Sequence, residues 1–556
     1  MQPTRDHPVD LAIPVLDIEG LTVRLPQGAD RVEAISELSL TVCRDEIVCV
    51  VGESGSGKSM IAHAVMGLLP DCIVATSGDI RLEGEDLLKA SPARLRTVRG
   101  SRMSMIFQEP MTALNPVVRV GKQIAEVLRV HGARSPADRL RRTLEVMKQV
   151  GLPDPEQLKD RYPHQLSGGQ RQRVMIAAAL ALEPALLIAD EPTTALDVTT
   201  QAQILRMIRT IQQQHHTGVL FITHDFGVVA EIADRVAVMQ HGRLVEIGGV
   251  EAVLRRPRHA YTRMLIASVP GLAPKVRAPS SLADTILSVA GVSKIYRPTS
   301  LFGRRGEIKA LDRVSLDVRR GETFGIVGES GSGKSTLARC VIRLIDPSGG
   351  AIHLGGTEIG RSWGETLRRA RKRVQIVFQD PYRSLNPRRS VGSSIVECPL
   401  NFGISTSEAW SRARELMGFV GLDPQALDRY PHEFSGGQRQ RICIARALAI
   451  RPELLIADEA VSALDVTVQA QVLKLLDETR RRFDLAVLFI THDLRVAAQV
   501  CDRIAVMHQG KIVETGATTE VFSRPQHDYT RQLLASAPGR GFQFGAAGLS
   551  EVEAIL

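Results

Sequence analysis

The sequence predicts an α/β protein that carries the same domain twice. The octapeptide GESGSGKS occurs at Gly52–Ser59 and again at Gly328–Ser335. Each copy directly follows a short apolar run, which is the pattern of a buried parallel strand. The blocks SGGQRQR, ADE and ITHD then follow in the same order in both halves. An ordered series of shared blocks of this kind indicates an internal duplication.

Local sequence patterns in the first half predict its main secondary-structure elements. Short apolar runs predict strands, apolar residues at helical spacing predict a helical insertion, and alternation around a His-Gly pair predicts a hairpin. The predicted segments are strands Ile47–Val51, Leu186–Ala189 and Val219–Thr223, helices Ile124–Val130 and Arg142–Val150, and a hairpin across Arg235–Ile247 centred on His241-Gly242.

The composition is that of an ordinary globular protein. The chain has 556 residues, of which 44% are hydrophobic, and a formal net charge of +9, which is too modest to identify a nucleic-acid binder. The seven cysteines form no C-x-x-C pair, so we expect reduced thiols. Neither a spanning apolar stretch nor a signal peptide is recognisable, so we expect a cytosolic chain that meets the membrane through partners.

Each half ends on a similar tail. RPRHAYT at 256–262 matches RPQHDYT at 524–530, and a stretch rich in Pro, Ala and Ser follows the first tail. We therefore predict a first domain over 1–269, a linker over 270–285 and a second domain over 286–556. A flexible linker of this length favours an intramolecular pair of domains.

The two octapeptides match G-x-x-x-x-G-K-[ST], the phosphate-binding loop that joins a strand to a helix. Backbone N–H groups and the helix N-terminus are expected to hold phosphates, Lys58 and Lys334 to reach the β- and γ-phosphates, and Ser59 and Ser335 to bind Mg²⁺. The predicted nucleotide-binding residues of these loops are Gly52, Ser54, Gly55, Gly57, Lys58, Ser59, Met60, Gly328, Ser330, Gly331, Gly333, Lys334, Ser335 and Thr336.

Acidic residues and a histidine follow later strands in each half. LLIADE places Asp190 and Asp458 where they would hold Mg²⁺. Glu191 and Glu459 follow by one residue and are the predicted catalytic carboxylates that orient and polarise water. His224 and His492, each at the end of another apolar run, are the predicted catalytic histidines that contact the γ-phosphate and this water.

The block SGGQRQR resembles the signature motif of ABC ATPases. This resemblance implies two tandem P-loop ABC ATPase cassettes, each with a RecA-like α/β core, an antiparallel β subdomain and a helical signature subdomain, and it implies ATP hydrolysis. In the family the signature helix is presented to the ATP held by the opposite cassette. The residues implied to bind ATP in this way are Ser167, Gly168, Gly169, Gln170, Ser435, Gly436, Gly437 and Gln438.

Further family elements are present. Gln108 and Gln379 resemble the Q-loop glutamines of the family, which contact Mg²⁺ and sense the membrane partner. Asp197 and Asp465, each in an ALDV segment, resemble the D-loop aspartates. Tyr296 is the expected adenine-stacking residue of the second half. The first half has Leu25 at the corresponding place, and the second half has Ala460 where the first has Pro192.

The chain is most similar to the peptide/nickel importer ATPases of bacteria, some of which fuse both cassettes in one chain, including importers of peptides and of glutathione. The flanking MTALNP, RSLNPR and RYPH segments and the two tails carry this resemblance. It implies ATP and Mg²⁺ as cofactors, two multi-pass permease subunits, an extracytoplasmic solute-binding protein, and a peripheral position on the cytoplasmic face of the inner membrane. Glu109–Leu114 and Asp380–Leu385 are the expected permease-facing segments. Gly271–Thr285, which follows the first tail, has no cysteine, so we expect no iron–sulfur cluster.

Three other classes of protein would carry the same ATP-binding residues. A soluble twin-cassette ATPase acting on the ribosome or on nucleic acid is the main alternative, but such proteins usually have a long charged helical linker. DNA-repair ATPases carry zinc fingers or long coiled coils, and an exporter would lack importer-type tails. We therefore expect no nucleic-acid partner. The transported solute is open among peptide, glutathione and nickel chelate.

Overall fold

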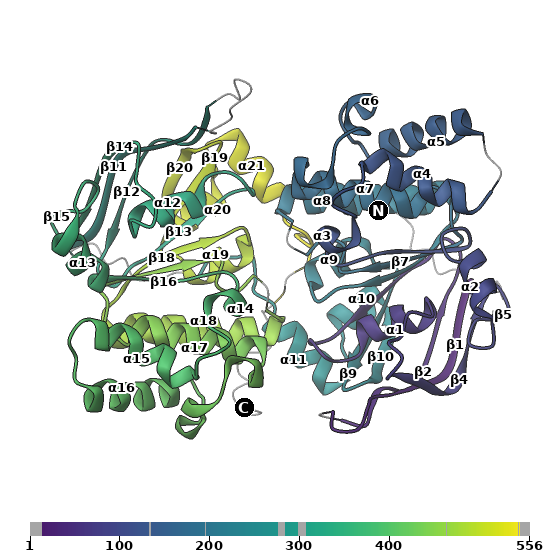
Figure 1. Ribbon diagram of the computed structural model, residues 1–556, viewed down its shortest axis with the longest axis horizontal. Coiled ribbons are helices and arrows are strands. Elements are labelled where there is room, and N and C mark those ends of the chain that lie inside the picture. Colours follow the sequence, from purple (N-terminus) through teal and green to yellow (C-terminus); the bar gives the residue numbers. More distant parts are fainter. Residues whose placement is uncertain are drawn as a thin grey trace. The chain divides into compact units, whose positions relative to one another are not determined.

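A computed structural model of the chain (Figure 1) describes residues 14–29, 31–132, 135–194, 196–275, 284–297, 307–462, 464–542 and 544. The chain divides into two compact units, Met1–Leu196 with Thr200–Ile266 and Asp197–Thr199 with Ala267–Leu556. We call them the first and second cassettes. The domain limits and the linker inferred from the sequence stay predictions, and residues 276–283 of that linker lie outside the described residues.

The first cassette is built around a largely parallel sheet whose central strand leads into the phosphate loop. Strand β3 is buried at every residue and pairs in parallel with β8 and β9. Only the edge strand β10 runs antiparallel to its neighbour. The strands of this sheet are, in spatial order, β10 (Arg243–Gly249), β9 (Arg235–Gln240), β3 (Ile47–Val51), β8 (Gly218–Ile222), β7 (Leu186–Asp190) and β6 (Met103–Ile106).

A separate antiparallel sheet belongs to the same cassette. Its alternating residues, such as Ile18, Leu38 and Ile80, join one hydrophobic cluster with residues of β3 and of helix α1. Alternation of this kind is expected of a sheet that buries one face. The strands are, in spatial order, β2 (Glu33–Val42), β1 (Leu16–Arg24), β4 (Val74–Leu82) and β5 (Glu85–Asp86).

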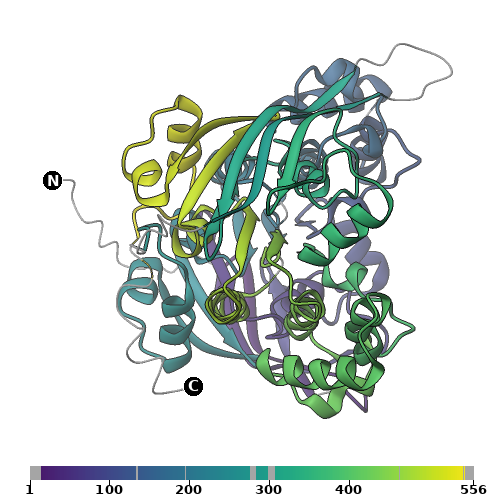
Figure 2. The same ribbon diagram turned by 90° about the vertical axis from the view of Figure 1, so that its left-hand side faces the viewer.

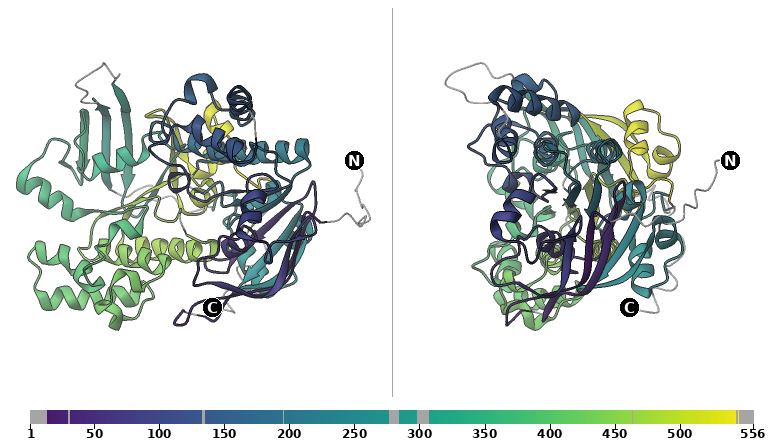
Figure 3. Two further views of the ribbon diagram at one scale, coloured as in Figure 1. Left: turned by 45° about the vertical axis from the view of Figure 1, so that its right-hand side comes forward. Right: turned by 90° about the vertical axis from the view of Figure 1, so that its right-hand side faces the viewer.

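Helices complete the first cassette, and Figure 3 shows the blue helices α4 and α5 apart from the purple strands β1 and β2. Helices α4, α5 and α7 contact one another and form the predicted helical insertion. The helices are α1 (Lys58–Val65), α2 (Pro92–Val98), α3 (Pro110–Ala113), α4 (Val120–Val130), α5 (Pro136–Gln149), α6 (Pro155–Leu158), η1 (Pro163–Gln165), α7 (Gly168–Leu180), α8 (Val198–His215), α9 (Phe226–Ile232), α10 (Val250–Arg255) and α11 (Ala260–Ser268).

The second cassette repeats both sheets, and Figure 2 shows its green helices α15 and α16 apart from its antiparallel sheet. The main sheet has the same strand order as in the first cassette, with β13 at the phosphate loop. Its strands are β16 (Val374–Val377), β17 (Leu454–Asp458), β18 (Ala486–Thr491), β13 (Thr323–Val327), β19 (Arg503–His508) and β20 (Lys511–Ala517). The antiparallel sheet consists of β12 (Ile308–Arg319), β11 (Thr285–Tyr296), β14 (Gly349–Leu354) and β15 (Thr357–Glu358).

The helices of the second cassette follow the order of those in the first. They are α12 (Lys334–Val341), α13 (Gly364–Arg373), α14 (Pro381–Ser384), α15 (Val391–Asn401), α16 (Thr406–Phe419), η2 (Pro424–Asp428), η3 (Pro431–Glu433), α17 (Gly436–Leu448), α18 (Val466–Phe483), α19 (Leu494–Val500), α20 (Thr518–Ser523) and α21 (Asp528–Ala535).

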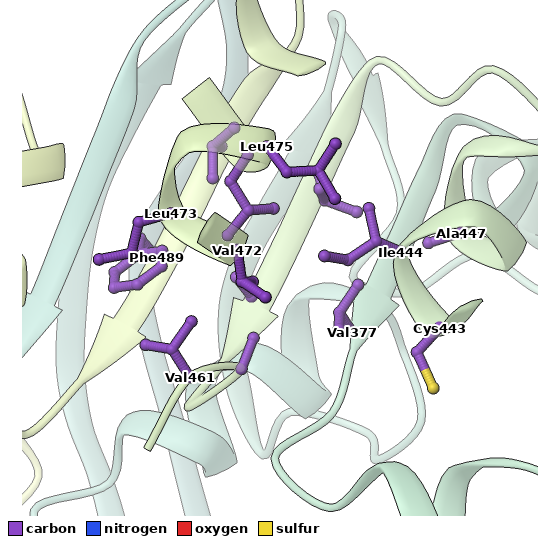
Figure 4. Close-up of a cluster of buried hydrophobic side chains, with 14 of the residues drawn as sticks. Val377, Cys443, Ile444, Ala447, Val461, Val472, Leu473, Leu475 and Phe489 are labelled. Atoms are coloured by element: carbon purple, nitrogen blue, oxygen red, sulfur yellow. The ribbon is translucent and has the colours of Figure 1, made fainter. Parts of the chain in front are cut away.

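A dense aliphatic core holds helices α17 and α18 on the main sheet of the second cassette (Figure 4). Ile444 of α17, Val472 of α18 and Phe489 of β18 are buried in one cluster with Val377 of β16. Burying each such side chain contributes about 1.5–3 kcal/mol. This packing fixes the end of β17 and the start of α17, where predicted site residues lie.

The structure confirms the predicted fold class and the named elements of the first half. The predicted strands coincide with β3, β7 and β8 to within one residue, and the hairpin is β9–β10. His241 and Gly242 both have positive φ, as a two-residue hairpin turn requires. Among the described residues, no helix has both the length and the hydrophobicity to cross a bilayer.

Candidate functional site

The two phosphate loops connect the central strand of each main sheet to a helix. β3 ends at Val51 and α1 begins at Lys58, while β13 ends at Val327 and α12 begins at Lys334. The two predicted residues after each lysine, Ser59 and Met60 or Ser335 and Thr336, lie in the first turn of the helix.

Glycines are sterically necessary at both ends of each loop. A Cβ on Gly52 would lie 2.2 Å from the carbonyl oxygen of Met239, and one on Gly57 would lie 2.5 Å from that of Ala34. Gly328 and Gly333 meet equivalent obstacles at the same distances. These positions also have φ between +105° and +154°, which side chains rarely adopt. The backbone at these four positions therefore accommodates only glycine.

The loop lysines are held against their own loops. Lys58 Nζ donates to the carbonyls of Gly52 at 2.7 Å and Glu53 at 2.8 Å. Lys334 Nζ donates at 2.8 Å to both Gly328 and Glu329. Burial lowers the pKa of Lys334, although the nearby carboxylates of Glu459 and Asp458 oppose this shift. Each ammonium group is thus held by the first two residues of its own loop.

The predicted magnesium ligands adjoin each other in both cassettes. Ser59 Oγ donates to Asp190 Oδ1 at 3.0 Å, and Ser335 Oγ donates to Asp458 Oδ1 at 2.9 Å. Burial raises the pKa of both aspartates. A hydroxyl beside a carboxylate is a hard oxygen donor set that fits Mg²⁺, which commonly binds one or two protein oxygens together with phosphates and water.

Glu191 of the first cassette accepts three side-chain hydrogen bonds. His224 Nδ1 lies 3.0 Å from one carboxylate oxygen, while Thr194 Oγ1 and Gln108 Nε2 each lie 2.9 Å from the other. Burial disfavours the charged carboxylate, but hydrogen bonds from His224 and Thr194 and the charge of Lys58 outweigh it and lower the pKa of Glu191 to about 2. The structure therefore brings three predicted residues, Gln108, Glu191 and His224, into one cluster.

Glu459 of the second cassette is held less firmly. His492 Nδ1 lies 3.4 Å from its carboxylate. Ser462 donates instead to the backbone carbonyl of Glu459, at 3.0 Å. Gln379 makes no hydrogen bond to Glu459 within the described part of the chain. Burial works against ionisation, yet His492 keeps the pKa of Glu459 below its usual value and Glu459 in turn raises that of His492.

Both catalytic candidates sit in a left-handed backbone conformation. Glu191 has φ of 47° and Glu459 has φ of 50°. The backbone N–H of each bonds to the neighbouring strand, at Ile222 or Ile490. Non-glycine residues adopt this conformation at a cost and often do so at functional sites.

The signature serines cap their own helices. Ser167 accepts a hydrogen bond from the backbone N–H of Gln170, whose side-chain oxygen accepts one from the N–H of Ser167, and Ser435 and Gln438 repeat this capping box. Gly168 and Gly436 begin the helices. A Cβ on Gly169 would lie 2.9 Å from Thr200, and one on Gly437 would lie 2.4 Å from Val468, so both glycines permit close helix packing.

The segments expected to face a permease carry exposed side chains. Met111 in α3 is 55% exposed and Tyr382 in α14 is 62% exposed. Arg171 donates to the sulfur of Met111, and the guanidinium of Arg439 lies 3.9 Å from the centre of the Tyr382 ring. Both arginines belong to signature helices, so each exposed segment is tied to a signature helix.

Comparison with known proteins agrees with this geometry. The model of the family described as "ABC transporter" matches residues 35–194 and 311–462, which together cover more than half of the chain. The chain belongs to the ABC transporter family. A second family model, described as "Oligopeptide/dipeptide transporter, C-terminal region", matches residues 245–290 and 513–543, which include both tail motifs.

Members of the ABC transporter family from enterobacteria are similar along nearly the whole chain. Proteins named glutathione import ATP-binding protein GsiA from Escherichia coli and from Shigella sonnei are each 46% identical, over 94% of this chain and 89% of theirs. Among solved structures, the dimeric bacterial ABC transporter cassette MJ0796 matches with a TM-score of 0.38 and 30% identity, covering 42% of this chain and 98% of its own.

The two cassettes of this ABC family member differ where an adenine ring is expected. Tyr296 is 40% exposed, and Lys294 Nζ lies 5.3 Å from its ring centre. Leu25 is partly buried against the hydrophobic cluster of the first cassette. Adenine stacking on Tyr296 stays a prediction.

Two kinds of site residue escape the sequence-based reasoning. The hydroxyl of Thr194 reaches Glu191, and the only signal for it was a polar residue in the loop after ADE. Tyr261 and Tyr529 of the tails contact the phosphate loops, because the backbone N–H of Glu53 or Glu329 donates to the phenolic oxygen at 3.2 Å. The presence of the tail motif in both halves indicates that these tyrosines are important, but it does not indicate their role.

Proposed function

We propose that the chain is the ATP-binding and ATP-hydrolysing subunit of a membrane importer for peptides or related small solutes. The observation that carries this proposal is the repeated cluster at the carboxyl ends of the main-sheet strands, in which a phosphate loop faces Asp190 and Glu191 or Asp458 and Glu459. Ligands of open α/β sheets bind at such edges. The similarity to glutathione import ATP-binding proteins along 94% of the chain supports it.

Each phosphate loop would bind the β- and γ-phosphates of ATP. The glycine-limited wrap directs backbone N–H groups inward, and the start of α1 or α12 adds its dipole. Lys58 and Lys334 would exchange their carbonyl partners for phosphate oxygens. Ser59 with Asp190, and Ser335 with Asp458, would hold Mg²⁺, which would neutralise charge on the phosphates.

Glu191 and Glu459 would orient and polarise the water that attacks the γ-phosphate. The low pKa of Glu191 keeps its carboxylate ionised at neutral pH, so that it can accept a hydrogen bond from water. His224 and His492 fix the carboxylates from the neighbouring strand end. Gln108, which contacts Glu191, would report the state of the site to the exposed segment that follows it.

Two multi-pass permease subunits are the proposed partners, with the chain on the cytoplasmic face of the membrane. The exposed Met111 and Tyr382 would contact permease helices, and the arginines behind them would carry the movement of each signature helix to that contact. An extracytoplasmic protein would deliver the solute. The match of both tails to the oligopeptide/dipeptide transporter region favours a peptide-like solute.

Capture of the ATP-bound state tests this proposal. Glu191→Gln combined with Glu459→Gln should retain ATP but hydrolyse it poorly. We expect the tagged double variant, purified from solubilised membranes with ATP and Mg²⁺, to bring down two multi-pass proteins. A variant with Lys58→Ala and Lys334→Ala, which should bind little ATP, serves as the control. Recovery of ribosomal proteins or nucleic acid instead would contradict the importer function.

A further inference from the structure

The two tail motifs, RPRHAYT and RPQHDYT, have no assigned role in ATP binding, yet the tyrosine next to the end of each motif contacts a phosphate loop. The contact joins residues 208 positions apart in the first cassette and 200 apart in the second. The backbone N–H to phenolic oxygen distance is 3.2 Å in both. Tyr261 is 5% exposed and Tyr529 is 8% exposed, so both rings are fixed by packing.

The other residues of each motif hold the tyrosine in place. Glu246 of β10 accepts the backbone N–H groups of Arg258 at 2.8 Å and His259 at 3.0 Å. His259 Nδ1 then accepts the N–H of Tyr261 at 3.2 Å, just as α11 begins. A strand of the main sheet thus anchors the tail, and the histidine sets the start of the helix that carries the tyrosine.

The second cassette repeats every one of these contacts. Glu514 of β20 accepts the N–H groups of Gln526 at 2.8 Å and His527 at 3.0 Å, and His527 Nδ1 accepts the N–H of Tyr529 at 3.1 Å. The ring of Tyr529 also lies 4.0 Å from that of His508, centre to centre, at the end of β19. Because the same hydrogen bonds hold the tail in both cassettes, this arrangement is a regular feature of the fold.

The tyrosine holds one specific peptide of the loop. Glu53 is the second residue of GESGSGKS. Its N–H donates to Tyr261 and belongs to the same peptide unit as the carbonyl of Gly52, which accepts Lys58 Nζ at 2.7 Å. The hydroxyl therefore fixes the peptide that supports the lysine, and it withdraws this N–H from those available to phosphate. Burial raises the pKa of Tyr529 to about 12, so its hydroxyl stays protonated.

We infer that Tyr261 and Tyr529 are positioning residues of the two phosphate loops, through which the C-terminal tail of each cassette sets the affinity of that cassette for nucleotide. This inference rests on the proposed binding of ATP by these loops. The hydroxyl contributes by holding the loop in its binding conformation before nucleotide arrives, which lowers the ordering cost of binding.

Removal of the hydroxyl alone tests the inference in the full-length chain. Tyr261→Phe and Tyr529→Phe keep the buried ring, and the double variant combines them. We expect Kd for a fluorescent ATP analogue and KM for ATP to rise about 2- to 10-fold, the change that one hydrogen bond supports, with kcat nearly unchanged. Tyr162→Phe, which removes a phenolic hydroxyl elsewhere in the first cassette, should change neither constant.

Hydrogen–deuterium exchange without nucleotide provides a second readout. The peptides that contain the two phosphate loops should exchange faster in the double Tyr→Phe variant and at the wild-type rate in Tyr162→Phe. Unchanged Kd and unchanged loop exchange in the double variant would overturn the inference. A wild-type chain that binds no nucleotide would contradict the proposed function. The role of the tyrosines in nucleotide affinity would then also be excluded, even if the loops of the double variant exchanged faster.

Discussion

The hydroxyl of Thr194 donates a hydrogen bond of 2.9 Å to the carboxylate of Glu191. The matching residue of the second cassette, Ser462, donates to the backbone carbonyl of Glu459 instead. The carboxylates of the two cassettes thus differ in how firmly they are held, although the ADE and ITHD blocks around them are shared.

We expect Thr194→Val, which keeps the side-chain shape, to lower kcat for ATP roughly 10-fold, because hydrogen bonds to charged groups contribute about 1.5–3 kcal/mol and this one orients the carboxylate. Steady-state phosphate release measures the effect. Thr194→Ser should recover most of the activity. Ser462→Ala is the matched control in the second cassette and should cost less than Thr194→Val. Equal losses in the two variants would contradict the assigned difference.

Replacement of Gly52 by alanine should abolish nucleotide binding by the first cassette. A Cβ there would lie 2.2 Å from the Met239 carbonyl, so either the loop or strand β9 must shift. Gly55→Ala is the control, since a Cβ at Gly55 meets nothing within 4 Å. Its φ of +75° still implies a cost of about 1–2 kcal/mol. Titration with a fluorescent ATP analogue should therefore separate the two variants, and equal affinities would show that the close approach is unimportant.

Glu191 should make stability depend on pH. Its pKa is about 2 in the folded chain, against 4.5 for an ordinary glutamate, so the unfolded chain binds the proton more tightly. The ionised carboxylate therefore stabilises the fold above about pH 4.5, and this contribution is lost as the pH falls toward 2. We expect Glu191→Gln to lower the urea midpoint at pH 7 and to lower it less at pH 4, corresponding to a loss of at most about 3 kcal/mol at neutral pH. An effect that grows on acidification would be inconsistent with the lowered pKa.

The exposed Met111 and Tyr382 should matter for the complex and not for the ATP sites. We expect Met111→Glu and Tyr382→Glu to reduce co-purification with the permease subunits, since each puts a charge where an apolar contact is proposed. Circular dichroism of the purified chain checks that folding is kept. Val117→Glu is a matched control at a residue that is 78% exposed and lies outside both proposed segments. Retention of the permease by both first variants would exclude these segments as the contact.

The sequence alone predicts the elements whose signal is local. Ile47–Val51 reads as a buried strand because every residue is apolar, and the structure buries every one. The hairpin follows from its His-Gly turn. The distance along the chain between the phosphate loop and ADE does not show that Ser59 meets Asp190, but parallel strands bring their carboxyl ends to one edge of the sheet, which makes that meeting foreseeable.

The contacts that the sequence could not predict depend on how distant segments meet. Thr194 and Ser462 both carry a hydroxyl after ADE, yet one donates to a carboxylate and the other to a backbone carbonyl. The bond from Glu53 to Tyr261 spans 208 residues and depends on the path of the tail from β10. No local pattern of residues encodes such distances.

Phosphate release by the purified full-length chain is the measurement that decides whether both cassettes hydrolyse ATP. We expect that hydrolysis of ATP requires Mg²⁺, and that Glu191→Gln combined with Glu459→Gln abolishes it while the affinity for ATP is kept. Each single replacement should reduce turnover, because both cassettes carry a complete set of predicted catalytic residues. Hydrolysis that survives in the double variant at the wild-type rate would exclude the two glutamates as catalytic residues, and a wild-type chain that binds ATP without hydrolysing it would exclude the proposed ATPase activity.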